Sequence, residues 1–216
     1  MLDDLKALVC KYNKLLITKG LVSMTSGNVS ARDFESGLIV IKPSGVDFEE
    51  LTPDSMAVVD LDGNIIGGRF KPSVDTATHL YVYRHMPGVN SVIHTHSNFA
   101  TAFAALGKPI PCCLTAIADE FGGPIPVSDY AKIGEEEIGR EIVAKIGTCP
   151  AILMKNHGVF TVGRTVPDAF KAAVMVEDVA KTVYLAFSMG QPLEIQPDEV
   201  ARAHKRYIDK YGQTGK

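Results

Sequence analysis

The chain has 216 residues, of which 46% are hydrophobic and 22% charged, a composition typical of ordinary globular proteins. Its formal net charge of -3 and isoelectric point near 6.1 argue against nucleic acid or a membrane surface as a partner. This length suffices for one well-packed domain and is short for two. We therefore expect a single domain over residues 1–216.

Two sequence features bear on the location of the protein. The first six residues are acidic and amphipathic, unlike a signal peptide, and no apolar run approaches the roughly 20 residues of a membrane span. The four cysteines contain no Cys-x-x-Cys pair, and we expect them to be reduced, mostly buried thiols. Both features indicate a cytoplasmic protein.

The first half of the chain alternates between helical and strand patterns. Apolar residues at helical spacing predict a first helix over 3–19, which Gly20 ends. A polar glycine turn then leads into a strand near 28–32, followed by a strand over 38–41. A hairpin is predicted around Asp62-Gly63-Asn64, and a helix follows Lys71-Pro72-Ser73.

The second half continues the alternation. Strands are predicted near 91–94, 151–154 and 159–163, and helices near 99–106, 138–146 and 168–187, with a last short helix after Pro197. Residues 109–126 are rich in proline and glycine and are predicted to be irregular. The alternation indicates an α/β domain, although it does not give the strand order.

Two histidines follow directly from the apolar strand at 91–93. Alternate residues of a strand share a face, so His94 and His96 point the same way, with Cα atoms roughly 6.6 Å apart. Two imidazoles at that separation can converge on one ion, whose bonds to nitrogen are about 2.0–2.1 Å long. A pair of polar residues at a strand end explains the pattern equally well, so a third ligand is needed.

His157 is the candidate third ligand. It follows another apolar strand and precedes Gly158, where the backbone can pass close to a bound group. Three histidines with an open position are typical of a catalytic zinc site. Asp75 either joins this site or is an ordinary helix N-cap, and the sequence favours neither. His79, one helical turn later, is either structural or a support of the site.

Two short loops could hold an anionic group beside the metal. Ser26-Gly27-Asn28 and Pro43-Ser44-Gly45 offer hydroxyls and backbone N–H groups without bulk, and Ser73 lies near the start of a helix. With Lys42, they form a candidate phosphate pocket. Each loop alone is as well explained by an ordinary turn.

Five ordered segments resemble motifs of the class II aldolase/adducin family. They are Ser-Gly-Asn-Val-Ser (26–30), Lys-Pro-Ser-Gly-Val-Asp (42–47), Lys-Pro-Ser-Val-Asp-Thr-Ala-Thr-His (71–79), His-Thr-His-Ser (94–97) and Asn-His-Gly-Val-Phe (156–160). Within the family the chain is most similar to the L-ribulose-5-phosphate 4-epimerases. The similarity extends from about Leu2 to Gln213.

The resemblance implies a single three-layer α/β/α domain with a central, mostly antiparallel sheet. It implies a homotetramer with active sites between subunits, in which the tail 197–216 completes a neighbouring subunit's site. The implied metal is Zn²⁺, with Mn²⁺ or Co²⁺ as alternatives. The residues that it carries over are metal ligands (Asp75, His94, His96, His157), residues of the substrate and phosphate pocket (Gly27, Asn28, Lys42, Ser44, Gly45, Ser73) and an acid/base pair (Asp119, Tyr211).

The activity that the resemblance implies is interconversion of L-ribulose 5-phosphate and D-xylulose 5-phosphate. C4 of a ketose phosphate is not acidic, so inversion there requires cleavage and re-formation of the C3–C4 bond, with an acid/base group on each side of the aldehyde. Aspartate at position 75, where fuculose-type aldolases carry glutamate, favours the epimerase. The alternatives are an L-fuculose-1-phosphate-type aldolase and a non-enzymatic, adducin-like assembly module.

The sequence departs from the epimerase pattern in three places. Val74 stands where serine is common, so one side-chain contact to phosphate is lost, and Ile117 stands where the pattern has histidine. The segment after Pro126 is also shorter than in typical epimerases. These departures bear on the substrate more than on the metal chemistry.

Overall fold

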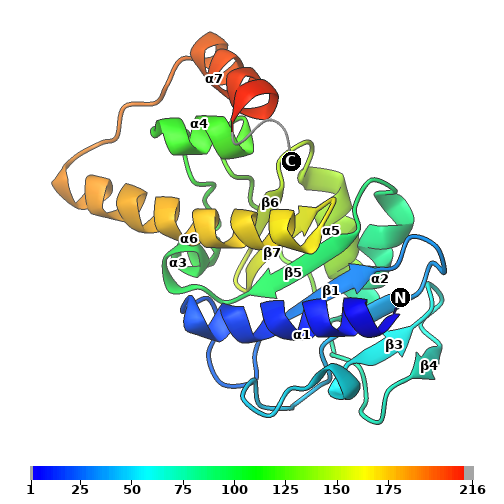
Figure 1. Ribbon diagram of the computed structural model, residues 1–216. Helices are drawn as coiled ribbons and strands as arrows, with labels where there is room; N and C mark the ends of the chain where they lie inside the picture. Colours follow the sequence, from blue (N-terminus) through cyan, green and yellow to red (C-terminus); the bar gives the residue numbers. More distant parts are fainter. Residues whose placement is uncertain (1, 212–216) are drawn as a thin grey trace.

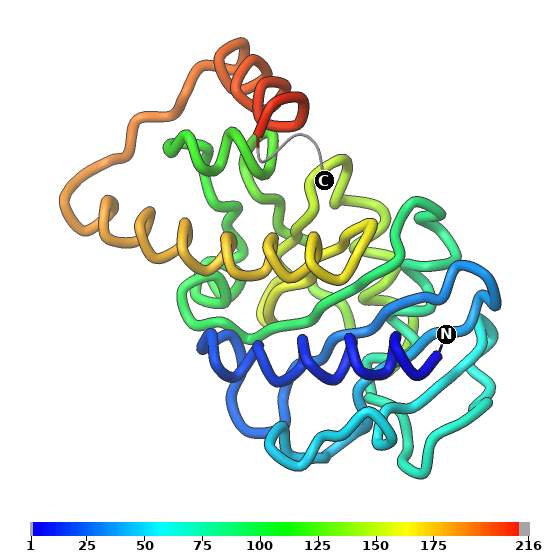
Figure 2. The backbone as a smooth tube through the Cα atoms, viewed as in Figure 1, coloured from blue at the N-terminus to red at the C-terminus, as the bar shows by residue number. Residues whose placement is uncertain are grey.

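One central sheet organises the protein in the computed structural model, which describes residues 2–211 (Figures 1 and 2). Within these residues the sheet has seven strands in the order β4-β3-β2-β1-β5-β7-β6, and neighbouring strands are antiparallel. The strands are β1 (Asn28–Arg32), β2 (Ile39–Ile41), β3 (Ala57–Val59), β4 (Ile65–Gly67), β5 (Ser91–Thr95), β6 (Ala151–Met154) and β7 (Gly158–Gly163).

Helices cover both faces of this sheet. They are α1 (Leu2–Thr18), α2 (Thr76–His85), α3 (Asn98–Leu106), α4 (Thr115–Phe121), α5 (Glu137–Lys145), α6 (Val166–Met189) and α7 (Pro197–Lys210), with a short 3₁₀ turn at Pro53–Ser55. In Figure 1, α1 and α6 cross one face, α2 and α5 lie behind the other, and α4 and α7 pair beyond α6. The three-layer α/β/α fold with an antiparallel sheet is therefore confirmed.

Strand β5 is buried along its whole length, and its two apolar residues, Val92 and Ile93, pack on opposite faces of the sheet. Ile93 packs in the cluster that contains Val9 and Leu16 of α1, whereas Val92 packs with Leu80 of α2 and its neighbours from α5. Because side chains alternate along a strand, His94 shares the face of Val92. The histidine therefore emerges beneath α2, at the end of the strand.

The sequence-based element boundaries are close to those observed, with two exceptions. Residues 109–126 were predicted to be irregular, but they contain helix α4. Its seven residues are too few to display a helical period, although Ile117, Ala118 and Phe121 all pack into the core. Asp119 thus lies on a helix. The last helix, predicted to be short, extends over 14 residues.

Helix α6 begins two residues earlier than predicted because of its capping sequence. The Thr165 side chain accepts a hydrogen bond from the Asp168 amide at 3.3 Å, and Pro167 occupies the first turn, where a missing N–H costs nothing. No helix among residues 2–211 is both long and apolar enough to cross a membrane. The four cysteines, all within these residues, are free thiols.

Candidate active site

Three strands bring the first site residues together. The register of the sheet pairs Asn28 of β1 with His94 of β5, and His94 in turn with Phe160 of β7. His157 lies in the tight turn between β6 and β7, where the preceding Asn156 has a left-handed backbone (φ 59°). The β6–β7 hairpin thereby returns His157 to the end of β5.

The three histidines form one cluster. One ring nitrogen from each of His94, His96 and His157 lies within 4.8 Å of the others. The ring centroids of His94 are 4.5 Å from His96 and 4.7 Å from His157. Nitrogen ligands bound at about 2.0–2.1 Å to one ion lie within about 4 Å of one another, so a small inward movement of the rings would bring all three nitrogens onto one metal ion.

The hydrogen bonding of the cluster also fits a divalent metal. Nδ1 of His94 is 3.0 Å from the Val159 carbonyl oxygen, to which it donates, so the lone pair is on Nε2. Nε2 of His94 and of His96, and Nδ1 of His157, are buried without a hydrogen-bond partner among the described residues. Burial lowers the pKa of all three rings, that of His94 to about 3, which keeps them neutral and able to coordinate.

Two glycines allow the backbone to approach this cluster closely. A Cβ atom on Gly158 would lie 2.5 Å from the Thr95 carbonyl oxygen and 2.6 Å from Cδ2 of His96. A Cβ atom on Gly27, whose φ is +77°, would lie 2.9 Å from the His94 carbonyl oxygen. A side chain on Gly158 would displace His96, whereas one on Gly27 would clash first with Val22, 2.4 Å from its Cγ1, and then with the His94 backbone.

Asp75 is oriented toward the site rather than toward its own helix. It occupies the N-cap position of α2, yet its side chain makes no capping hydrogen bond. Instead, the Asn28 amide donates to Oδ2 of Asp75 at 2.7 Å and to Oγ of Ser73 at 3.0 Å. Burial alone would raise the pKa of Asp75, but nearby His94 and His79 and the Asn28 amide offset it and lower it. This carboxylate therefore remains anionic beside the histidines.

A cavity of about 370 Å³ opens over these residues. Its lining combines the histidine cluster and Asp75 with the two serine–glycine loops predicted from the sequence (Thr25, Ser26, Gly27, Asn28, Lys42, Pro43, Ser44, Gly45, Ser73, Val74, Asp75, His94, His96, Ile133, His157). The metal candidates and the phosphate-pocket candidates thus share one cavity. We call it the histidine cavity.

Lys42 contributes to this cavity in a way that the sequence did not indicate. Its ammonium donates to the Thr25 carbonyl at 3.0 Å and to the Pro43 carbonyl at 3.4 Å, and lies 4.6 Å from the Phe48 ring centroid. Burial lowers its pKa to about 8. Lys42 therefore holds the two loops together as well as supplying positive charge.

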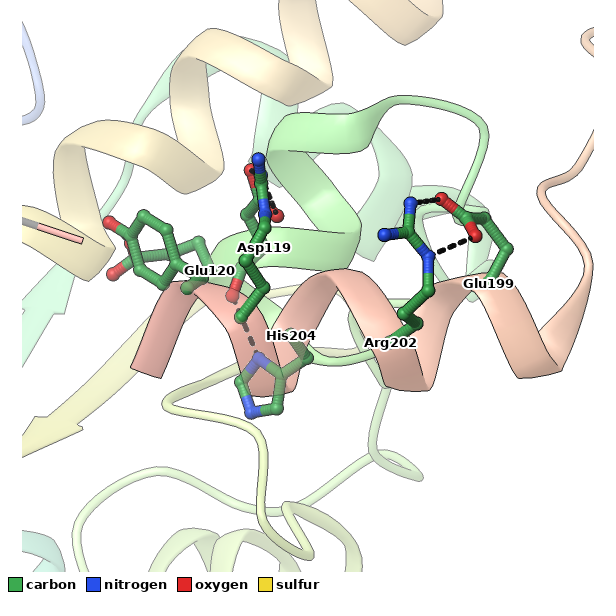
Figure 3. A network of polar contacts seen from close by, with 7 residues as sticks. Asp119, Glu120, Glu199, Arg202 and His204 are labelled. Atoms are coloured by element: carbon green, nitrogen blue, oxygen red, sulfur yellow. Dashed lines mark hydrogen bonds and ion pairs between the residues drawn. The ribbon is translucent and has the colours of Figure 1, made fainter. Parts of the chain in front are cut away.

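Asp119 and Tyr211 lie together, but outside the histidine cavity. Both line a separate cavity of about 300 Å³, together with Arg206, Tyr207 and Lys210. The Arg206 guanidinium donates to both Asp119 carboxylate oxygens at 3.2 and 3.3 Å, and His204 lies against the Asp119 carbonyl (Figure 3). Residues 212–216, which include the last two residues of the Tyr-Gly-Gln ending and the end of the tail 197–216, lie outside the described residues.

Contacts of α7 with α4 and α6 orient Tyr207, on which Tyr211 stacks. The Tyr207 hydroxyl donates to Glu120 at 2.6 Å, and the Lys171 ammonium lies 2.9 Å from the same carboxylate. The Tyr207 ring stacks on Tyr211 with a centroid distance of 4.5 Å. A further cavity between α7 and the sheet is lined by Tyr207, Val89 and Gly163, so α7 lies near the start of β5, opposite the end that carries the histidines.

Some residues around these cavities had no signal in the sequence. Ile133 lines the histidine cavity from an exposed loop, and its residue type gives no indication of that place. Arg206 and Tyr207 belong to an ordinary amphipathic helix pattern, so only their partners identify them.

Comparison with known proteins assigns the chain to a family. Residues 7–184 match the sequence profile of the class II aldolase and adducin N-terminal domain. An L-ribulose-5-phosphate 4-epimerase, UlaF, of Salmonella paratyphi B is 40% identical over 98% of this chain and 96% of its own length. A solved L-fuculose 1-phosphate aldolase superposes with a TM-score of 0.91 at 31% identity, covering 95% of this chain and 96% of its own. The L-fuculose-1-phosphate aldolase of Thermus thermophilus reaches 0.74 at 25% identity, covering 88% and 98%. The chain therefore belongs to the class II aldolase and adducin family.

Proposed function

We propose that the protein is a zinc-dependent epimerase that interconverts L-ribulose 5-phosphate and D-xylulose 5-phosphate. The observation that carries the proposal is the 40% identity to an epimerase over 98% of the chain. The histidine cavity supports it with a neutral nitrogen cluster beside two hydroxyl-rich loops. Asp119 and Tyr211, which line one further cavity, would supply the two acid/base groups that epimerisation needs.

His94, His96 and His157, with Asp75 beside them, would hold the metal. Nitrogen donors and a carboxylate suit zinc, although cobalt and manganese accept the same set. A divalent cation bound there supplies Lewis-acid polarisation of the substrate carbonyl. The Asn28 amide fixes the Asp75 carboxylate, so that this side chain keeps its orientation while substrate enters.

The serine–glycine loops and Lys42 would bind the phosphate group of the ketose. Ser44 and Ser73 offer hydroxyls, and Gly27 and Gly45 leave backbone N–H groups accessible at the cavity wall. The positive charge of Lys42 is offset by the negative charge of Asp75 nearby. The charge of an anionic substrate would therefore be neutralised only when a metal cation is also bound.

Asp119 and Tyr211 would move the protons at the C4 oxygen. One of them takes the proton of the C4 hydroxyl as the C3–C4 bond breaks and an aldehyde forms. The aldehyde rotates so that its opposite face meets C3, and the C3–C4 bond re-forms with inverted configuration at C4. The second group then gives a proton to the C4 oxygen. An aldolase releases the aldehyde instead, and so needs no group on the second side.

We propose that these two residues act in the histidine cavity of a neighbouring subunit of a cytoplasmic homotetramer. Within one chain they line a different cavity, near the opposite end of β5. A neighbouring copy is then required to complete each site, with residues 197–216 as the contributing segment.

Product analysis tests the reaction directly. Incubation with L-ribulose 5-phosphate should yield D-xylulose 5-phosphate, with no accumulation of free glycolaldehyde phosphate. Accumulation of the aldehyde would instead identify an aldolase, the second candidate, which the TM-score of 0.91 to an L-fuculose 1-phosphate aldolase favours. An adducin-like module without activity would bind no metal, and the unpartnered histidine nitrogens argue against it.

Mixing of inactive variants tests the shared site. Random assembly of equal amounts of His96→Ala and Tyr211→Phe subunits should give about a quarter of the sites an intact pair of halves, and activity should return to that level. A mixture of His96→Ala with His157→Ala is the control, because neither subunit supplies an intact histidine cluster. If the first mixture stays as inactive as the control, the shared site is wrong.

A further inference from the structure

Helix α2 and strand β1 are joined by a line of buried polar contacts that extends away from the histidine cavity. Asn28 donates to Asp75, as described above. Two residues further along β1, Oγ of Ser30 lies 2.7 Å from Nδ1 of His79 and 2.6 Å from the Tyr83 hydroxyl. The partners on α2 therefore lie at positions 75, 79 and 83.

The spacing of these contacts matches the two elements. Two residues of a strand advance about 6.6 Å, and four residues of a helix advance about 6 Å. Asn28 and Ser30 share one face of β1, and Asp75, His79 and Tyr83 share one face of α2. These hydrogen bonds thus fix the position of α2 along the direction of β1. A slide would separate Asp75 from Asn28.

The hydrogen bonds of Ser30 with His79 and Tyr83 form a buried network of uncharged groups. Ser30 and His79 are fully buried, and Tyr83 is 1% exposed. Ser30 has a single hydroxyl proton, so it donates to one of its partners and accepts from the other. Burial lowers the pKa of His79 to about 4, so the ring stays neutral near pH 7. Breaking either bond would leave a buried polar atom unpaired.

His79 also reaches the other side of the cluster. Its ring packs edge-on against Phe160 with a centroid distance of 5.9 Å, and Phe160 stacks on His94 at 4.2 Å. Nε2 of His79 is buried without a partner among the described residues, so Ser30 supplies the hydrogen bond that orients this ring. The His79 imidazole therefore contacts Phe160, which stacks on His94, and it also lies on helix α2, which begins directly after Asp75.

We propose that Ser30 and His79 are positioning residues that hold Asp75 and His94 in the arrangement that binds the metal. The role rests on the proposed function, since it presumes that the histidine cavity holds a divalent cation. Neither residue lines the cavity itself. They act through Asp75, Asn28 and Phe160.

A matched pair of substitutions at Ser30 separates hydrogen bonding from packing. Ser30→Thr and Ser30→Val add the same bulk, but only the threonine keeps a hydroxyl. Loss of a residue that orients metal ligands weakens metal affinity about 10- to 100-fold. Co²⁺ is titrated calorimetrically into the metal-free full-length protein. We expect its Kd to be at least tenfold higher for Ser30→Val than for Ser30→Thr. The visible spectrum of bound Co²⁺ should shift in Ser30→Val alone.

A second pair keeps the test decisive if the Ser30 variants do not fold. His79→Gln retains a side-chain amide that can bond to Ser30, whereas His79→Leu does not, and the same tenfold difference is expected. Equal Co²⁺ affinities and spectra within a folded pair, with only the melting temperature lowered, would mean that these residues stabilise the fold and do not position the ligands. Wild-type protein that binds no Co²⁺ would overturn the proposed function itself. Neither readout requires substrate.

Discussion

Substituting Gly158 by alanine should disrupt the histidine cluster without replacing any of its histidines. The added Cβ would lie 2.5 Å from the Thr95 carbonyl oxygen and 2.6 Å from Cδ2 of His96. Since Cβ contacts under 3.0 Å essentially never occur, strands β5 and β7 must separate by at least 0.5 Å here. Metal–ligand distances tolerate a change of only about 0.2 Å. We therefore expect metal affinity to fall by a factor on the order of ten or more.

The assay is calorimetric titration of Zn²⁺ into metal-free protein, with the melting temperature of the metal-free form as a second measurement. Gly88→Ala is the matched control, because no heavy atom lies within 4 Å of the Cβ that it would add. The control should bind metal like the wild type. If Gly158→Ala does so too, then the cluster does not depend on this close approach, and the geometric argument for the site fails.

Three further predictions concern the same region. His157→Ala should lose bound metal while the oligomer stays intact, as elemental analysis and size-exclusion chromatography would reveal; full metal occupancy would remove His157 from the ligand set. Because burial lowers the pKa of His79 from 6.5 to about 4, the unfolded chain gains a proton before the folded one as pH falls. The contribution of His79 to the free energy of unfolding of the metal-free protein is fully present above pH 6.5 and should fall by about 3 kcal/mol by pH 4. In His79→Gln, urea unfolding at the two pH values should show a loss of stability that is smaller by this amount. Val74→Ser, at a 67% exposed position on the cavity wall, should lower KM for the phosphorylated ketose roughly fivefold through one added hydrogen bond; Val74→Ala, which adds no donor, should not.

The fold was largely accessible from the sequence because its signals are local. Helix α6 has a clear apolar pattern, and the apolar pair Val92-Ile93 directly before His94 indicated that the histidines lie at a strand end. Helix α4 was missed because a seven-residue helix between proline and glycine shows too little of its period. The strand order, which brings β1 between β2 and β5, depends on long-range pairing that no local pattern encodes.

The sequence indicated which residues belong to the candidate site, but it did not indicate how they contact one another. The pattern around Asp75 fits an N-cap as well as a metal site, and the sequence does not indicate that its side chain makes no capping bond and bonds to Asn28 instead. Lys42 was expected to bind phosphate, but its contacts with the Thr25 and Pro43 carbonyls depend on loop conformation. The separation of Asp119 from the histidine cavity is likewise a property of the assembled chain.

The distance along the chain between the site residues has a consequence for folding. Asn28 meets Asp75 across 47 positions, and the histidine cluster joins β5 to the β6–β7 turn. Contacts of such long range form late, because the loops between them must close first. Under the proposed function, a metal ion would therefore find no complete set of ligands until the sheet is nearly assembled. It should slow unfolding while leaving the folding rate almost unchanged, so the metal protects a finished fold rather than nucleating it.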